Sequence, residues 1–198
     1  MLNLPYPVVL ASASPRRREL LSRMISEFEI LPADLDETIF VNPVPWQTAR
    51  DSAAAKAAHL AKQRPEALII GGDTVVAIPI RGGYEQLAKP ADNKDAERML
   101  HKLSGIQHLV ITGVCLIWPD GQKSFEVTSG VTFRKLEAQE VREYADSGES
   151  LDKAGAYAVQ GKGAAFIESV DGSLTNVIGL PVEKLREELQ AITEVQVA

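Results

Sequence analysis

The sequence predicts an α/β protein with a mixed β-sheet. Segments typical of strands alternate with segments typical of helices along the 198 residues, which favours a sheet covered by helices. Residues 108–136 are predicted instead to form a long antiparallel hairpin around a Pro-Asp-Gly turn. Apolar residues make up 45% of the chain, enough for a sizeable core, and no internal repeat or linker divides it.

The first half contains a series of predicted elements. They are, in order, a buried strand at 8–11, a helix capped by Ser14 and opened by Pro15, a strand leading into a loop at 28–37, and an alanine-rich helix at 46–63. Residues 67–78 follow as two apolar runs rich in Ile and Val. Gly71-Gly72-Asp73 is expected to break them, which places Asp73 at a strand end.

The second half continues the alternation. A helix after Asp92, the hairpin, a helix at 137–146, a glycine-rich loop feeding a strand, and a helix opened by Pro181 follow in that order. The final helix carries an apolar stripe of Val182, Leu185, Leu189 and Ile192.

Composition excludes several classes of function. Cys115 is the single cysteine, so no internal disulfide forms, which suits the cytoplasm; its apolar strand makes it a core residue. The first twelve residues lack the basic start of a signal peptide, and no apolar stretch is long enough to span a membrane. A net charge of −6 argues against duplex nucleic acid as a ligand. No P-loop or dinucleotide fingerprint occurs.

Three consecutive arginines, Arg16, Arg17 and Arg18, open the first predicted helix. Cations are unfavourable at this end, where the free N–H groups already carry partial positive charge. Successive helix residues point about 100° apart, so the three cannot share one solvent face. Arginine donors beside free helix N–H groups suit a phosphate, and the small residues 11–13 allow close approach. The segment therefore predicts a phosphate site.

Several other charged residues are ambiguous from their patterns. Asp73 is either a turn residue or a functional carboxylate, and with Asp36-Glu37 and nearby Asp34 it could hold a divalent metal. Spacing alone makes Lys56 an ordinary surface lysine and leaves Lys89 open. Lys153 and Lys162 flank the loop around Gln160, where cations could reach a phosphate chain.

A set of motifs taken together is far more specific. In order they are LASASPRRRELL, DLDET, SAAAKA, GGDTVV, AKPAD, LSG, LDKAGAYAVQGKG and VIGLP. From about residue 8 to 190 this order resembles that of the Maf proteins, a family of nucleoside triphosphate pyrophosphatases. The resemblance implies one domain over 1–198 with a bent mixed sheet flanked by helices and a cleft between two lobes, similar to inosine-triphosphate pyrophosphatases.

The resemblance also implies an activity and its residues. A nucleoside triphosphate would be cut between its α and β phosphates with Mg²⁺ or Mn²⁺ as cofactor. Asp73 matches the family's proton acceptor, and Glu37 matches an acidic residue that handles metal or water; both are expected metal ligands. The remaining matches are Lys56 and Lys89 as catalytic cations and Ser12 and Arg17 as phosphate ligands. Mg²⁺ prefers oxygen ligands and keeps several waters, so no His or Cys cluster is required. Whether Asp73 acts as base or metal ligand stays open.

The base that the site accepts is also implied by the resemblance. Arg16, Thr74 and Gln160 match the branch that takes dTTP and UTP, whereas the 7-methyl-GTP branch tends to have Trp, Gln and Glu there. The Gln160 amide and the Thr74 hydroxyl can each donate or accept. Two alternatives are a broader action on modified pyrimidine nucleotides and a nucleotide-binding regulator of septum formation with little turnover. A homodimer is an expectation for the assembly.

Overall fold

The computed structural model describes residues 1–195 of the chain. Its strands are β1 (Val8–Ala11), β2 (Glu29–Ile30), β3 (Leu68–Ile80), β4 (Gly83–Leu87), β5 (Gln107–Trp118), β6 (Gly121–Phe133) and β7 (Ile167–Asp171). Its α-helices are α1 (Pro15–Ser22), α2 (Pro45–Ala61), α3 (Asn93–Leu103), α4 (Ala138–Asp146), α5 (Leu174–Ile178) and α6 (Val182–Val195). Short 3-10 helices are η1 (Glu37–Phe40), η2 (Ala154–Ala156) and η3 (Lys162–Phe166).

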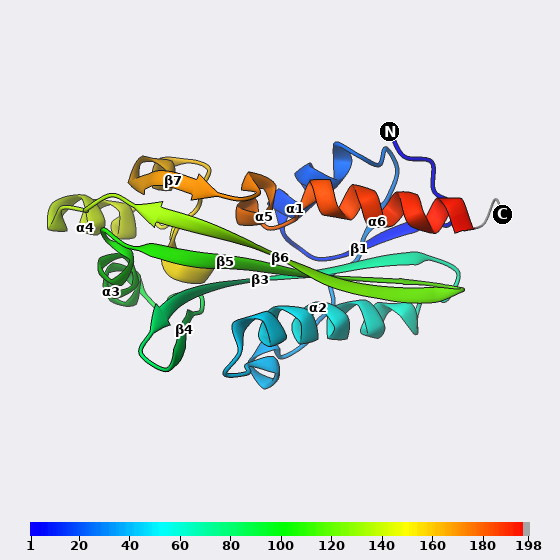
Figure 1. Ribbon diagram of the computed structural model, residues 1–198, viewed down its shortest axis with the longest axis horizontal. Helices are drawn as coiled ribbons and strands as arrows, with labels where there is room; N and C mark the ends of the chain where they lie inside the picture. The colour runs from blue at the N-terminus through cyan, green and yellow to red at the C-terminus, as the bar shows by residue number, and fades with distance from the viewer. Residues whose placement is uncertain (196–198) are drawn as a thin grey trace.

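The described strands form one long mixed sheet in the order β2-β1-β3-β5-β6-β7, with β4 also paired to β3. β1 runs parallel to β2 and β3, and the remaining pairs are antiparallel. Helix α2 lies along one face, and α1 and α6 lie along the other (Figure 1). The strand residues follow this division, since Leu10 packs with the α1 and α6 side chains and Val9 packs with α2. The predicted hairpin at 108–136 is confirmed as β5 and β6.

The prediction that Gly71-Gly72-Asp73 breaks the strand is wrong. β3 runs without interruption through all three residues, and Asp73 pairs with Gly113 of β5. The glycines serve helix packing instead: a Cβ on Gly71 would lie 2.3 Å from the carbonyl oxygen of Ala53, and one on Gly113 would lie 2.3 Å from that of Ala49. The missing side chains let the α2 backbone lie directly on the sheet. Asp73 is therefore a strand-interior residue and not a turn residue.

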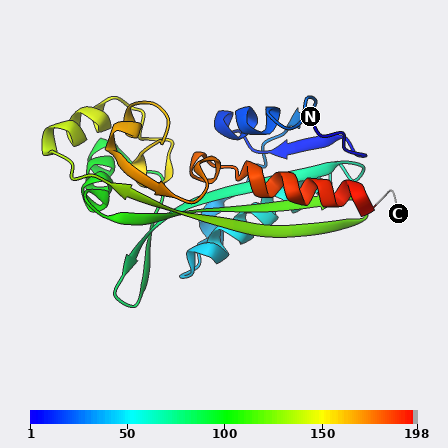
Figure 2. The ribbon, with the colours of Figure 1, turned by 45° about the horizontal axis from the view of Figure 1, so that its top comes forward.

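Among the strands and α-helices, β4 and α5 were not predicted. β4 forms a hairpin with β3 across a turn at Arg81-Gly82 that projects from the sheet (Figure 2). Its sequence GYEQL carries little of the Val and Ile enrichment typical of strands. α5 has five residues, too few to show a helical period, and begins where Ser173 caps the Asn176 N–H.

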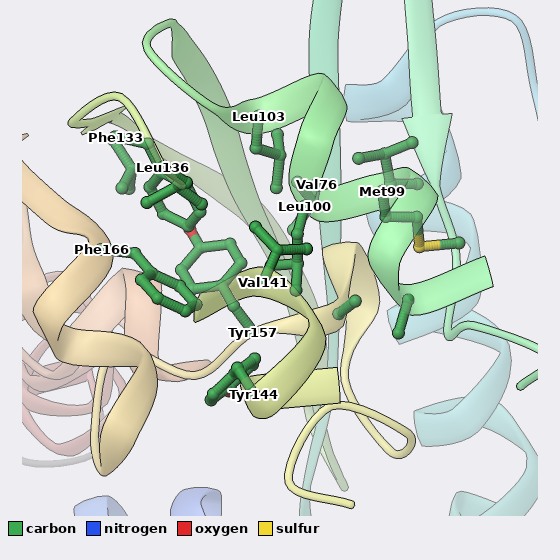
Figure 3. Packing of buried hydrophobic residues seen from close by; sticks show 14 of the residues in the cluster. Val76, Met99, Leu100, Leu103, Phe133, Leu136, Val141, Tyr144, Tyr157 and Phe166 are labelled. Atoms are coloured by element: carbon green, nitrogen blue, oxygen red, sulfur yellow. The ribbon is translucent and has the colours of Figure 1, made fainter. Parts of the chain in front are cut away.

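Apolar cores lie at both ends of the sheet. One cluster joins the far ends of β3 and β6 to α3, α4 and the loop around Tyr157 (Figure 3). Two others pack α1, α6 and α2 against β1 and the start of β3, and Cys115 is buried among them as predicted. In the part of the chain that the structure describes, no helix is long and apolar enough to cross a membrane.

A buried histidine lies in the first of these cores. His108 on β5 is fully buried, its Nε2 lies 2.8 Å from the Tyr157 hydroxyl, and its ring meets Phe133 edge-on. Its Nδ1 has no hydrogen-bond partner among the described residues. Burial lowers the pKa of His108 to about 4, because the apolar surroundings disfavour the charged ring.

This pKa predicts a loss of stability in mild acid. Below the ordinary histidine pKa of about 6.5, His108 becomes protonated in the unfolded chain but stays neutral in the folded chain. This difference should lower the unfolding free energy by about 2 kcal/mol at pH 5. In His108→Gln this loss should disappear. Urea unfolding at pH 7 and pH 5 checks it, and equal acid losses in wild type and variant would contradict it.

Candidate active site

A notch in the edge of β3 forms the centre of the site. The β1 ladder ends where Ala11 pairs with Gly71, and the β4 ladder ends where Leu87 pairs with Val76. Between them, residues 72–75 of β3, here called the notch, are paired with β5 alone among the described strands. The carboxyl ends of β1 and β4 meet the notch from opposite sides, the kind of place where α/β sheets bind ligands. A cavity of about 670 Å³ lies here.

Helix α2 supplies the cation on one face of the notch. Lys56 Nζ donates to Asp73 Oδ1 at 2.7 Å, and the two side chains are 8% and 16% exposed. The surface position expected for Lys56 from its spacing is wrong. The alanines around it let α2 lie close to the sheet, so the lysine extends under the helix toward the notch.

Two further hydroxyl residues of α2, Ser52 and Thr48, line the cavity one and two turns before Lys56, respectively. Thr48 Oγ1 accepts from the Asn42 N–H at 2.9 Å and donates to its carbonyl oxygen at 3.2 Å, which fixes the loop before α2. Ser52 Oγ is buried and has no hydrogen-bond partner among the described residues. Sequence reasoning missed both, although their spacing of four from each other and from Lys56 places them on its helix face.

Helix α1 supplies a second cation from the opposite face. Ser14 caps the helix as predicted by accepting from the Arg17 N–H. The Arg17 guanidinium donates to the Gly179 carbonyl at 2.8 Å, to Ser12 Oγ at 3.2 Å and to Thr74 Oγ1 at 3.0 Å. A Cβ on Gly72 would lie 3.4 Å from Arg17 Nε, so the glycine leaves room for the guanidinium. Ser12, Arg17 and Thr74 are thus brought together at the notch.

The three arginines of α1 separate as the helix geometry requires. Arg16 and Arg17 are half-buried and line the cavity, whereas Arg18 is exposed and is not among the described lining residues. Asp152 lines the same cavity as Arg16. Partial burial raises the pKa of Asp152, but the hydrogen bond from Lys153 and the charges of Lys153 and Arg16 outweigh this and hold the pKa below its usual value.

The remaining predicted residues lie at different depths. Lys89 is exposed just after β4 and lines the cavity, as does the half-buried Lys153. Gln160 and Lys162 are exposed and are absent from the described lining residues. The proposed base contact of Gln160 stays a prediction; its neighbour Val159 does line the cavity.

The acidic segment before α2 reaches the cavity through η1. Asp36 caps η1 by accepting from the Thr38 hydroxyl at 2.6 Å and the Thr38 N–H at 3.0 Å, and these bonds lower the pKa of Asp36. Thr38 lines the cavity. The side chain of Glu37, which opens η1, lies outside the described residues. Among those described, no group of three His, Cys, Asp or Glu side chains gathers as a metal site.

The family profile described as Maf-like protein matches residues 7–192. The chain belongs to the Maf family. The Maf motifs quoted from the sequence surround the notch: Ser12 and Arg17 follow β1, Asp73 and Thr74 lie in β3, and Lys56 binds Asp73 from α2.

Relatives of this Maf chain cover almost its whole length. A protein of Ruminiclostridium cellulolyticum is 40% identical over 94% of this chain and 96% of its own. A protein of Aquifex aeolicus is 41% identical over 93% and 95%, and one of Thermococcus kodakarensis is 44% identical over 91% and 95%. All three bear the name dTTP/UTP pyrophosphatase.

Solved structures show the same fold at low sequence identity. The Ham1 protein of Staphylococcus aureus matches with a TM-score of 0.53 and 16% identity over 96% of this chain and 99% of its own. A HAM1 protein of Coxiella burnetii matches with a TM-score of 0.54 and 16% identity over 94% and 99%. These matches confirm the predicted fold class for this Maf protein, a mixed sheet flanked by helices as in inosine-triphosphate pyrophosphatases.

Proposed function

We propose that this Maf protein hydrolyses dTTP and UTP to the nucleoside monophosphate and pyrophosphate. The observation that carries the chemistry is the notch itself, where Lys56 binds the Asp73 carboxylate on one face of β3 and Arg17 binds the adjacent Thr74 on the other. A triphosphate needs cations along its phosphates and a carboxylate near the reacting phosphorus. The pyrimidine substrates are supported by the names of relatives that are 40–44% identical along nearly the whole chain.

The proposed reaction is attack of water on the α phosphorus. A bond forms between the water oxygen and the phosphorus, and the bond to the oxygen bridging to the β phosphorus breaks. Asp73 accepts the proton of the water, and the bridging oxygen leaves with pyrophosphate. Lys56 holds the Asp73 carboxylate in place through Oδ1 and balances its charge. Arg16, Arg17 and Lys89, which line the same cavity, offset the charge of the phosphates and of the leaving group.

A divalent cation fits this arrangement as a proposed cofactor. Mg²⁺ is commonly held in proteins by one or two carboxylates together with substrate phosphates, so a site does not need a cluster of three protein ligands. Asp73 in the notch and Glu37 at the start of η1 are the proposed carboxylates, and Mn²⁺ is accepted by the same type of ligand. When bound, the cation would offset phosphate charge and activate the attacking water.

The partners and location follow from the same proposal. A nucleoside triphosphate is the substrate, and neither nucleic acid nor a membrane is needed. The cytoplasm is the proposed compartment, since such nucleotides are its ordinary constituents and Cys115 is a buried free thiol. The homodimer and the division into two lobes of one domain stay predictions.

A panel of triphosphates tests the proposed substrates. Uracil and thymine share an acceptor, donor, acceptor edge, whereas cytosine presents an amino donor where they have an oxygen. Each polar group left unpaired costs about 1–3 kcal/mol, so kcat/KM should be highest for dTTP and UTP and at least about tenfold lower for CTP. The positively charged 7-methylguanine base of 7-methyl-GTP should be repelled by Arg16, which lines the cavity.

Initial rates with Mg²⁺ across these four nucleotides check the order. A preference for 7-methyl-GTP would contradict the proposed substrate class. Binding of nucleotide without turnover of any of them would favour a regulator over an enzyme.

A further inference from the structure

A chain of hydrogen bonds links Arg17 to the interior of the sheet. Arg17 Nη2 donates to Thr74 Oγ1 at 3.0 Å, and Thr74 Oγ1 lies 3.0 Å from Thr112 Oγ1. Thr112 Oγ1 then donates to the main-chain carbonyl oxygen of Asn176 at 3.0 Å. Thr74 and Thr112 are paired across β3 and β5, which places both hydroxyls on the α1 face of the sheet. Thr112 and Asn176 are fully buried.

The direction of every bond in this chain is determined by the groups at its ends. The Arg17 guanidinium can only donate, and the Asn176 carbonyl can only accept. Thr112 has one hydroxyl proton and gives it to Asn176, so it must accept from Thr74. The Thr74 hydroxyl therefore donates its one hydrogen bond to Thr112 and accepts a hydrogen bond from Arg17. The freedom to donate or accept that the sequence suggests for Thr74 is removed by its neighbours.

The inner end of the chain is fixed to the sheet. Asn176 Nδ2 donates to the carbonyl oxygen of Val110 and to Ser129 Oγ, both at 3.0 Å. The segment just after Asn176 also contacts Arg17 directly, because the Gly179 carbonyl accepts from Arg17 Nε at 2.8 Å. The residues around α5 therefore hold the guanidinium at two of its nitrogens, at Nε directly and at Nη2 through the two threonines.

We propose that Thr112 is a positioning residue that orients Arg17 toward the phosphates through Thr74. This rests on the proposed function, since it takes Arg17 as a ligand of the triphosphate. Without the Thr112 oxygen, the Thr74 proton has no fixed acceptor and can turn toward Arg17. Two donors would then face each other, and the bond that orients the guanidinium would be lost.

Thr112→Val, which removes the hydroxyl and keeps the shape, tests the proposal. We expect kcat/KM for dTTP to fall about tenfold, as for one lost hydrogen bond to a charged group, and Thr112→Ser to stay within about twofold of wild type. Calorimetry with the non-hydrolysable α,β-methylene analogue of dTTP should show a similar fall in affinity. Thr132→Val on β6, away from the described cavity lining, is the matched control and should leave both values unchanged.

A double-mutant cycle separates positioning from a general loss of structure. In an Arg17→Lys background, Thr112→Val should lower kcat/KM for dTTP by less than about twofold. Lysine lacks the planar guanidinium that the hydrogen bonds through Thr74 and Thr112 orient. The same tenfold loss in both backgrounds, or a serine variant as impaired as the valine variant, would overturn the proposal. If Thr112→Val does not fold, Thr74→Val removes the same hydrogen-bond connection to Arg17. Its effect on kcat/KM is then measured in the wild-type and Arg17→Lys backgrounds.

The two proposals fail in different ways. A wild-type protein that binds the analogue but turns over no triphosphate would overturn the proposed function, and the affinities in the cycle would still decide on Thr112. A wild-type protein that does not bind the analogue would overturn both.

Discussion

Asp73→Asn should lower kcat for dTTP by about 10²–10⁴ while nucleotide still binds, if Asp73 accepts the proton of the attacking water. The amide keeps the shape of the side chain and an oxygen for Lys56, which donates to Asp73 Oδ1 at 2.7 Å. It loses the negative charge and with it the ability to take a proton. Initial rates with Mg²⁺, together with the affinity for the α,β-methylene analogue, measure the two effects separately.

Asp171→Asn provides the matched control for this substitution. Asp171 is an exposed residue at the end of β7 and is not among the described residues that line the cavity, so its variant should keep wild-type rates. An Asp73→Asn protein with most of its activity intact would show that the carboxylate takes no part in the chemistry.

Lys56→Met should destabilise the fold strongly. The Lys56 and Asp73 side chains are 8% and 16% exposed, so the substitution leaves a carboxylate with little water around it and without its 2.7 Å partner. Breaking a buried ion pair on one side typically costs about 3–5 kcal/mol of unfolding free energy. Adding Asp73→Asn should recover more than half of this loss, since the neutral amide at residue 73 no longer leaves an unpaired carboxylate charge when Lys56 is removed. Urea unfolding at pH 7 measures all three variants.

Lys62→Met controls for the loss of a lysine in the same helix. Lys62 is the exposed C-cap residue of α2, and its substitution should change the unfolding free energy by no more than about 0.5 kcal/mol. A double variant no more stable than Lys56→Met alone would mean that the unpaired charge of Asp73 is not the source of the destabilisation.

The parts of this site that could be predicted from sequence depend only on residues that are close together along the chain. Ser14 caps α1 and Pro15 opens it, and both signals are confirmed. The cation excess at that helix start indicates an anion without any knowledge of the sheet, and Arg16 and Arg17 do line the cavity. The apolar stripe of the last helix likewise predicts its buried face at Leu185 and Leu189.

The parts that could not be predicted depend on contacts between distant segments. Whether Gly71 ends a strand or lies under a helix depends on α2, whose Ala53 carbonyl would be 2.3 Å from an added Cβ. Lys56 likewise has the local pattern of a surface lysine, and only its partner 17 residues along the chain reveals its role. Thr112 gives no signal at all in the sequence, because its importance comes from Thr74 across the strand pair and from Asn176 beyond.

The notch in β3 has a similar origin. It exists because β1 stops at Ala11 and β4 stops at Leu87, so that neither covers Asp73 and Thr74. β4 was itself missed, and the spacing between two strand ends along a third strand is a property of the assembled sheet. The resemblance to the Maf family identified most of the residues around the notch without indicating this geometry.

The identity of the products tests the central claim most directly. Wild-type protein incubated with dTTP and Mg²⁺ should form dTMP and pyrophosphate in equal amounts from the first turnover, as ion-exchange chromatography resolves them, and Asp73→Asn should form neither at a comparable rate. Appearance of dTDP and orthophosphate instead would contradict hydrolysis between the α and β phosphates.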